Sequence, residues 1–286
     1  MGFFYKCYMS MNDRKVVRVS TAKELFDTVS LDYKNLSVSY SDNIDFVNYF
    51  DFKPEDYLYF AKSDLMEKDK RGLINALSNA KRAIDCLIEN ILKNFDINIK
   101  KLPKVALDFC EEVLGDESKN IKPLSFRLFC ALGLSPIILV KEVRSLRNKV
   151  EHEFNNPQKE DVLRACEVAE LLINNLKAKE IYSCAIDISD IHRTRHSSRG
   201  SITGIRFDHT FVGDTNNGRF NIYFYDSNRG GCQYFLNQED KIYYYFLKAM
   251  FIAEFDSEEL KLCIKRIIKE IIPDINLSEI EISLNR

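Results

Sequence analysis

The sequence lacks the paired cysteines and the strong excess of one charge that would identify several protein classes directly. Its eight cysteines include no Cys-x-x-Cys pair, so neither a zinc ribbon nor a dithiol redox motif is expected. Most of them have apolar neighbours at helical spacing, which indicates reduced, buried thiols. The 41 Lys and Arg residues nearly balance the 43 Asp and Glu residues, giving a net charge of -2. Any basic surface for a nucleic acid must therefore be local.

Long apolar segments and familiar enzyme motifs are also missing. The first ten residues, MGFFYKCYMS, hold no long apolar stretch behind a basic start, so no secretory signal is expected. An apolar run such as Pro136 to Val140 is far too short to span a bilayer. We therefore expect a cytoplasmic protein with no membrane partner. The sequence contains no Gly-rich phosphate loop, no kinase signature and no Gly-x-Ser-x-Gly elbow.

What the chain does contain is an α+β pattern in three parts. These are a mixed N-terminal segment (1–53), a helical bundle (54–180) and a C-terminal α+β region (181–286). The sequence leaves open whether the two β-containing flanks share a sheet. Outside the bundle, strands are predicted at 15–19, 36–40, 201–212 and 219–225, and helices at 21–29, 239–254 and 257–271.

The bundle is predicted from apolar residues that recur at steps of three and four. The clearest stripe runs from about Asp69 to Phe95, with polar residues on the opposite side of the helix. Another helix starts near Pro136, a suitable first-turn residue, and is stopped by Asn155-Asn156-Pro157. Its apolar stripe is predicted to be Leu139, Val143, Leu146, Val150 and Phe154. Further helices are predicted at 104–114, 124–132 and 159–179, with a turn or loop at 115–120.

The helix that starts near Pro136 ends in a dense polar cluster, SLRNKVEHEF. Asn148 and His152 are four residues apart and lie nearly opposite the apolar stripe, while Arg147 and Glu151 lie at its border. The simplest interpretation is a solvated face on which Arg147 and Glu151 form an ion pair, worth roughly 0.2–0.5 kcal/mol. The alternative is an active site.

The spacing Arg147-Asn148-x-x-x-His152 resembles the signature of HEPN domains, which lies near the end of a bundle helix. The run 75–85, NALSNAKRAID, resembles the opening helix of such domains, and the resemblance covers about residues 55–180. It implies a HEPN-like bundle with metal-independent endoribonuclease activity that requires no cofactor. It also implies a role in defence or as a toxin, a homodimer, and an antitoxin or other regulatory partner.

The motif residues suit the cleavage of RNA by its own 2′-hydroxyl. His152 can act as acid or base near neutral pH, and Arg147 can hold the phosphate in two hydrogen bonds. Asn148 can donate to a phosphate oxygen or orient the His152 ring. Two copies facing across a two-fold axis would supply two histidines. The alternative is a catalytically inactive HEPN-like module for binding or dimerisation, with recognition in the C-terminal region.

Further RNA contacts are predicted among nearby and loop cations, namely Arg144, Lys149, Arg193 and Arg195. The last two belong to the basic run HRTRHSSRG at 192–200, which an ordinary loop explains equally well. His192 and His196, with Asp208 and His209, could bind a metal if 192–196 were helical. The neighbouring Gly and Ser argue against a helix, so no metal site is predicted.

Overall fold

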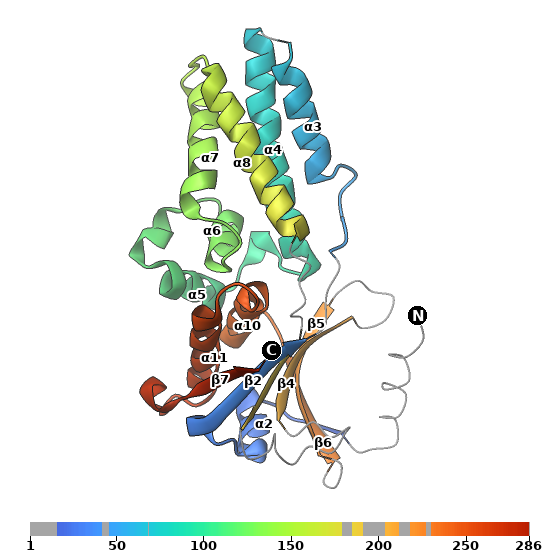
Figure 1. Cartoon of the computed structure of the whole chain (residues 1–286), viewed down its shortest axis with the longest axis vertical. Helices are drawn as coiled ribbons and strands as arrows, with labels where there is room; N and C mark the ends of the chain where they lie inside the picture. The colour runs from blue at the N-terminus through green and yellow to red at the C-terminus, as the bar shows by residue number, and fades with distance from the viewer. Residues whose placement is uncertain are drawn as a thin grey trace. The chain divides into compact units, whose positions relative to one another are not determined.

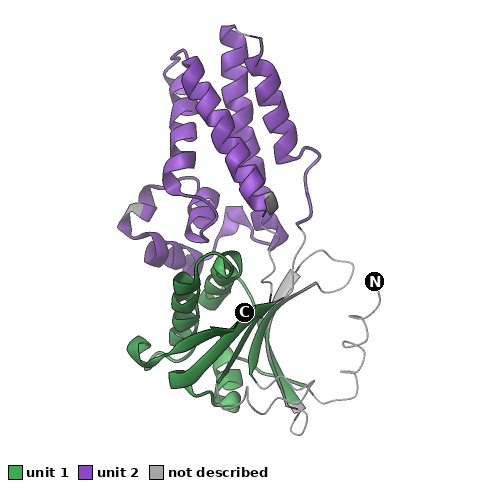
Figure 2. Ribbon diagram, in the orientation of Figure 1, with its two compact units in different colours: residues 1–43, 182–214, 219–286 green, residues 44–181, 215–218 purple. Residues whose placement is uncertain are grey.

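A computed structural model describes residues 16–41, 46–67, 69–178, 185–190, 204–211, 218–226 and 230–285. Its contacts divide the chain into unit 1 (residues 1–43, 182–214 and 219–286) and unit 2 (residues 44–181 and 215–218), which are coloured in Figure 2. Helices and strands are both present, so the predicted α+β class is confirmed. Most of the two segments that flank the predicted bundle belongs to unit 1, whereas residues 44–53, predicted as part of the N-terminal segment, belong to unit 2.

Unit 1 contains a sheet whose strands come from both flanks. Its order is β1-β6-β5-β4-β3-β2-β7. At one edge of the sheet, β2 lies antiparallel to β3 on one side and parallel to β7 on the other. The question that the sequence left open is therefore answered: the two flanks share a sheet. The strands are β1 (Val16–Arg18), β2 (Leu36–Ser41), β3 (Ala185–Asp190), β4 (Ile205–Phe211), β5 (Gly218–Asp226), β6 (Gly230–Leu236) and β7 (Ile282–Asn285).

In the described part of unit 1, the α-helices are α2 (Ala22–Val29), α10 (Lys241–Ile252) and α11 (Ser257–Ile271). The Thr21 hydroxyl caps α2 by accepting from the Glu24 amide at 3.2 Å. On β4, the Phe207 ring lies 6.4 Å from Phe26 of α2 and 5.3 Å from Phe246 of α10, between ring centroids. Both helices therefore cover the face of the sheet that carries Phe207. The described residues of this unit also include two short 3-10 helices, η2 (Tyr33–Asn35) and η5 (Leu277–Glu279).

Unit 2 is a bundle in which α4 packs against α3, α7 and α8 (Figure 1). The apolar stripe predicted for α4 is buried, with Leu77, Ile84 and Ile91 almost fully covered. Within the turn or loop predicted at 115–120, residues 116–120 form a 3-10 helix. The helices are α3 (Pro54–Leu65), α4 (Lys70–Asn94), η3 (Ile99–Lys101), α5 (Lys104–Leu114), η4 (Asp116–Asn120), α6 (Leu124–Ala131), α7 (Ile137–His152) and α8 (Lys159–Ala178).

The apolar stripe predicted for α7 is wrong at its end. The helix stops at His152, and Phe154 has a left-handed φ of 56° and is 89% exposed. The amides of Glu153 and Asn155 both donate to the Lys149 carbonyl at 3.2 Å, which closes the helix with a reversal of the chain. Phe154 therefore leaves the helical register that would have directed it toward the core.

Cysteines in the described ranges are free thiols, and five of these six are buried, as predicted. Burial is the main cause that raises the pKa of Cys110, Cys130 and Cys263 to about 12. Within the same ranges, no helix combines the length and apolar character needed to cross a membrane.

Candidate functional site

The three residues of the motif lie near the C-terminal end of α7. Arg147 is half-buried, whereas Asn148 and His152 are exposed. The Arg147 guanidinium pairs with the Glu151 carboxylate, and its Nη1 donates to Asn148 Oδ1 at 3.4 Å. Among the described residues, His152 has no hydrogen-bond or ion-pair partner. The helix ion pair that the simplest interpretation predicted is thus present, and the imidazole is open to solvent.

The pair between Arg147 and Glu151 does not close the site. The two side chains are 27% and 33% exposed, so water screens their attraction and the pair contributes little to stability. A phosphate can bind a guanidinium through two parallel hydrogen bonds, as a carboxylate can. Separating Arg147 from Glu151 therefore costs little free energy.

A groove of about 260 Å³ lies beside the motif, between α7 and the segment that leads from η4 into α6. Asn148 lines it, which connects the groove to the motif. The charged side chains that line it are Lys122, Lys141, Arg144 and Lys149 against the single carboxylate of Glu153. The three lysines are exposed and form no ion pair with any residue that the structure describes. This excess of positive charge suits a polyanion.

Arg144 has a second role that the sequence did not indicate. Its guanidinium pairs with Asp85 of α4, and Lys81 pairs with the same carboxylate. The guanidinium carbon also lies 5.6 Å from the centre of the Phe126 ring. Arg144 therefore links α4, α6 and α7, and only part of its side chain faces the groove.

The remaining predicted contacts, Arg193 and Arg195, lie outside the described residues, as do His192 and His196. The sequence also suggested Asp208 as a ligand of the possible metal site. It is buried on β4, and its Oδ2 lies 3.8 Å from Arg206 Nε. In the described ranges, no group of three or more His, Cys, Asp or Glu side chains could hold a metal ion.

The sequence reasoning missed two cations of the groove, Lys122 and Lys141. Lys141 lies on the same side of α7 as Arg144 and Lys149, at steps of three and eight, so helical spacing could have revealed it. Lys122 precedes α6 and reaches the groove only through the fold. No pattern in the sequence around Lys122 indicates that this residue lies at the groove.

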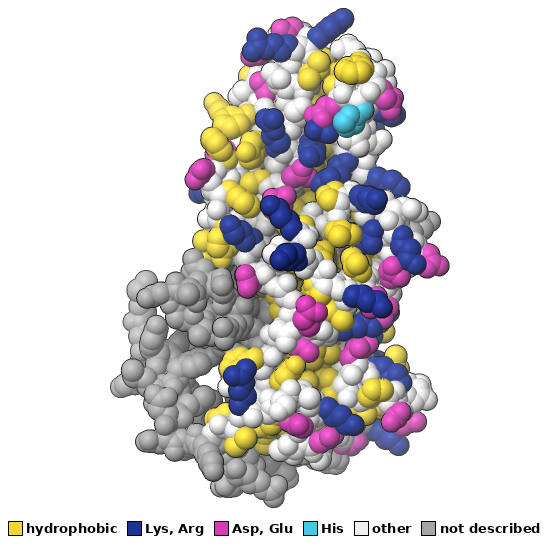
Figure 3. All heavy atoms as spheres, turned by 180° about the vertical axis from the view of Figure 1, so that it is seen from behind, with side chains coloured by type: hydrophobic (Ala, Val, Ile, Leu, Met, Phe, Trp, Pro, Cys, Tyr) yellow, Lys and Arg dark blue, Asp and Glu magenta, His cyan; other side chains and the backbone are white. Residues whose placement is uncertain are grey.

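The positive charge of the groove is a local feature. On the face drawn in Figure 3, Lys and Arg side chains alternate with Asp and Glu and form no continuous basic surface. This agrees with the nearly balanced composition. The chain matches none of the known protein-family models, curated proteins or solved structures with which it was compared.

Proposed function

We propose that unit 2 is a HEPN-like bundle and that the protein is an endoribonuclease that cuts RNA without a metal ion. The observation that carries this proposal is the grouping of Arg147, Asn148 and His152 at the solvent-exposed end of α7, beside a groove lined by four cations. The resemblance to the Arg-Asn-x-x-x-His signature supplies the reaction. A cytoplasmic role in defence or as a toxin, restrained by an antitoxin or other regulatory partner, belongs to the same proposal.

In this mechanism the 2′-hydroxyl of the RNA attacks the adjacent phosphorus. His152 takes the hydroxyl proton or protonates the leaving 5′-oxygen. Arg147 exchanges Glu151 for the phosphate and stabilises the negative charge that builds on its oxygens. Lys122, Lys141 and Lys149 hold the neighbouring phosphates along the groove.

A homodimer would place a second His152 in the same site and so provide both the base and the acid. The exposed position of His152 leaves it accessible to a second copy. We expect light scattering to give twice the chain mass at working concentration. A strict monomer would contradict the paired site.

The activity test compares the chain with His152→Ala and Arg147→Ala on total RNA in EDTA. Loss of a general acid or base lowers the rate roughly 10²- to 10⁴-fold, and loss of a charge-stabilising donor roughly 10²- to 10³-fold. The matched control is Arg164→Ala, which removes an exposed Arg–Glu pair of the same unit, with Glu142 at 2.9 Å. The control is expected to cleave normally. Equal cleavage by all four proteins would exclude this site.

The second candidate is a HEPN-like bundle that binds or dimerises without catalysis. The pairing of Arg147 with Glu151 favours it, because that guanidinium already has a partner in the free protein. RNA that stays intact with the unmodified chain, together with a stable dimer, would support this function over the enzyme.

A further inference from the structure

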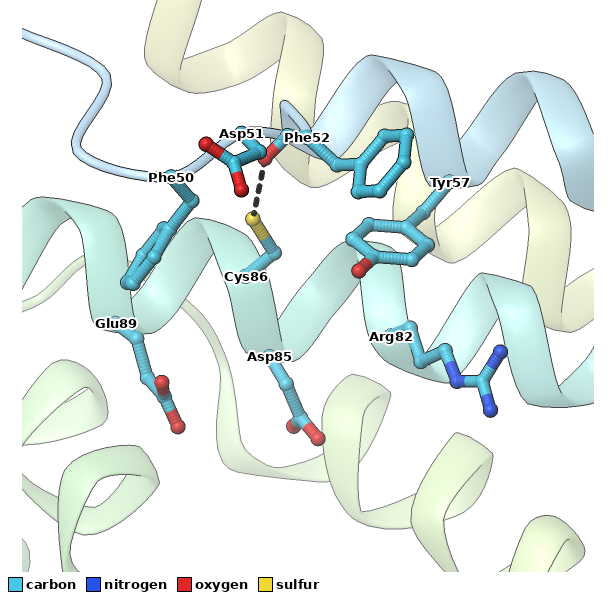
Figure 4. A pocket seen from close by; sticks show the side chains of 8 residues that line it. All are labelled: Phe50, Asp51, Phe52, Tyr57, Arg82, Asp85, Cys86 and Glu89. Carbon is cyan, nitrogen blue, oxygen red and sulfur yellow. Dashed lines mark hydrogen bonds between the residues drawn. The ribbon is translucent and has the colours of Figure 1, made fainter.

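Unit 2 contains a second pocket, of about 390 Å³, whose chemistry differs from that of the groove. It lies between α4, the start of α3 and the segment just before α3 (Figure 4). Aromatic rings and carboxylates dominate the lining. The residues are Phe50, Asp51, Phe52, Tyr57, Arg82, Asp85, Cys86 and Glu89.

One wall continues into a group of aromatic rings, Phe52, Tyr57, Tyr59 and Phe60, which we call the aromatic cluster. The Phe52 and Tyr57 ring centroids are 5.8 Å apart, and the Phe60 centroid lies 6.0 Å from that of Phe52. Phe52 is 51% exposed and Tyr59 is 69% exposed. Neighbouring aromatic rings left in water are typical of surfaces that another protein covers.

The carboxylates give the pocket an excess of negative charge. Asp51 and Glu89 are exposed and have no ion pair within the part of the chain that the structure describes. Asp85 is already paired with Lys81 and Arg144. Arg82 is the cation among the lining residues, and its Nη1 donates to Asn79 Oδ1 at 3.2 Å.

The pKa of Cys86, whose thiol lines the pocket, is affected by nearby carboxylates. Burial, followed by the charges of Glu89, Glu55, Asp56 and Asp85, raises the pKa of Cys86 to about 11. The Cys86 thiol therefore stays protonated near neutral pH. Its S–H group donates a hydrogen bond to the Phe52 carbonyl oxygen, with the two heavy atoms 3.5 Å apart. It is a structural donor here and not a nucleophile.

A cation–π interaction within the chain already involves Phe50, one of the rings that line the pocket. Lys93 Nζ lies 5.0 Å from the ring centroid of Tyr49 and 5.2 Å from that of Phe50. Phe52 and Tyr57 offer similar surfaces with Asp51 and Glu89 close by. Arg82 lines the same pocket, but within the described chain neither ring has a cation stacked on it. An aromatic face beside free carboxylates is the environment that a guanidinium prefers.

We propose that this pocket binds an arginine side chain of a partner protein, while apolar residues of the partner cover the aromatic cluster. A small organic cation would fill the pocket but leave Tyr59 and Phe60 in water, so the extent of the exposed rings favours a polypeptide. Arginine fits better than lysine, because its planar group can stack on a ring and bind a carboxylate through two hydrogen bonds. The proposal uses none of the residues assigned to RNA cleavage.

The test uses Phe52→Trp as a reporter, because the chain contains no tryptophan. The half-exposed position of Phe52 can accept the larger ring. The probe is a capped peptide with one arginine between leucines, compared with the same peptide carrying citrulline and with capped arginine alone. We expect saturable Trp emission changes with the arginine peptide and at least about tenfold weaker binding of each of the other two.

Further variants identify the carboxylates. In the reporter background, Asp51→Asn and Glu89→Gln are each expected to weaken binding of the arginine peptide about tenfold, since each removes a charge-assisted hydrogen bond. Glu142→Gln changes a carboxylate that does not line the pocket and is paired with Arg164, so it is expected to leave binding unaltered. Asp85 is not suitable, because its loss would also disturb Lys81 and Arg144.

Three results would overturn the proposal. They are the absence of a response to the arginine peptide, equal binding of the citrulline peptide, and capped arginine binding as tightly as the peptide. The last would identify a small-cation site instead. RNA cleavage by Glu89→Gln is measured in parallel and is expected to be normal, so failure here leaves the nuclease proposal standing.

Discussion

At the scale of single residues, the central question is whether a guanidinium that is already paired can also bind a phosphate. Arg147 has Glu151 as its partner on the same helix, an arrangement that i,i+4 spacing predicts. An ion pair within one helix depends only on residue spacing, so this pair could be predicted from the sequence. The second partner of Asp85, which is Arg144, lies 59 positions away and could not be predicted in the same way.

The first prediction concerns Glu151→Gln. This change removes both the competitor for Arg147 and a negative charge near the bound phosphate. We expect RNA to bind roughly two- to fivefold more tightly at low ionic strength, with nearly unchanged stability. Fluorescence anisotropy of a labelled single-stranded RNA measures the change, with Glu142→Gln as the control carboxylate on the same helix. Unchanged or weaker binding would remove Arg147 from the RNA site.

At the scale of helices and strands, periodicity succeeded where one face is continuously buried. The predicted limits of α4 were within one residue of the helix, because its stripe is long and regular. The same reasoning gave no separate prediction of α3, whose buried residues are only Pro54, Leu58 and Ala61. It also misjudged the end of α7, because a left-handed turn at Phe154 leaves no trace in apolar spacing.

The turn between α3 and α4 supplies the second prediction. A Cβ atom on Gly72 would lie 2.4 Å from the Asp64 carbonyl oxygen, which is backbone and cannot rotate away. Alanine gains about 1 kcal/mol in helix propensity, but relieving the overlap costs roughly 1–3 kcal/mol. We expect Gly72→Ala to destabilise the bundle by about 1 kcal/mol in urea unfolding. The neighbouring Arg71→Ala is the control and should be nearly neutral. A more stable Gly72→Ala protein would show that the turn relaxes freely.

At the scale of the whole molecule, the sheet of unit 1 was beyond sequence reasoning. Several of its strands were predicted individually, but Leu36 pairs with Asp190 on one side and with Ile282 on the other. Alternating apolar residues indicate that a strand forms, not which strand lies beside it. The prediction of a bundle at 54–180 rests on the difference between helical and strand periods, which does not show that residues 44–53 belong to the same unit.

The third prediction is a loss of stability at alkaline pH. The pKa is raised from 9.0 to about 11 for Cys86 and Cys166 and to about 12 for Cys110, Cys130 and Cys263. The folded chain therefore holds these protons more tightly than the unfolded chain. The free energy of unfolding from this source is constant below about pH 9 and falls as the pH rises toward 12.

Urea midpoints between about pH 8 and pH 11 measure this effect. Cys263→Ala removes one of the titrating thiols and is expected to flatten the decline, whatever it does to the midpoint at neutral pH. A midpoint that stays constant over this range would mean that the thiols are not protected in the folded protein.

The placement of β2 between β3 and β7 also constrains how the protein is made. The backbone of residues 44–181 is continuous, so a nascent chain can assemble this helical region before later residues leave the ribosome. β2 is synthesised earlier, but it can pair only after β3 and β7 have been synthesised, and β7 ends at Asn285. β2 therefore stays unpaired through most of translation, and an unpaired strand can pair with strands of other chains.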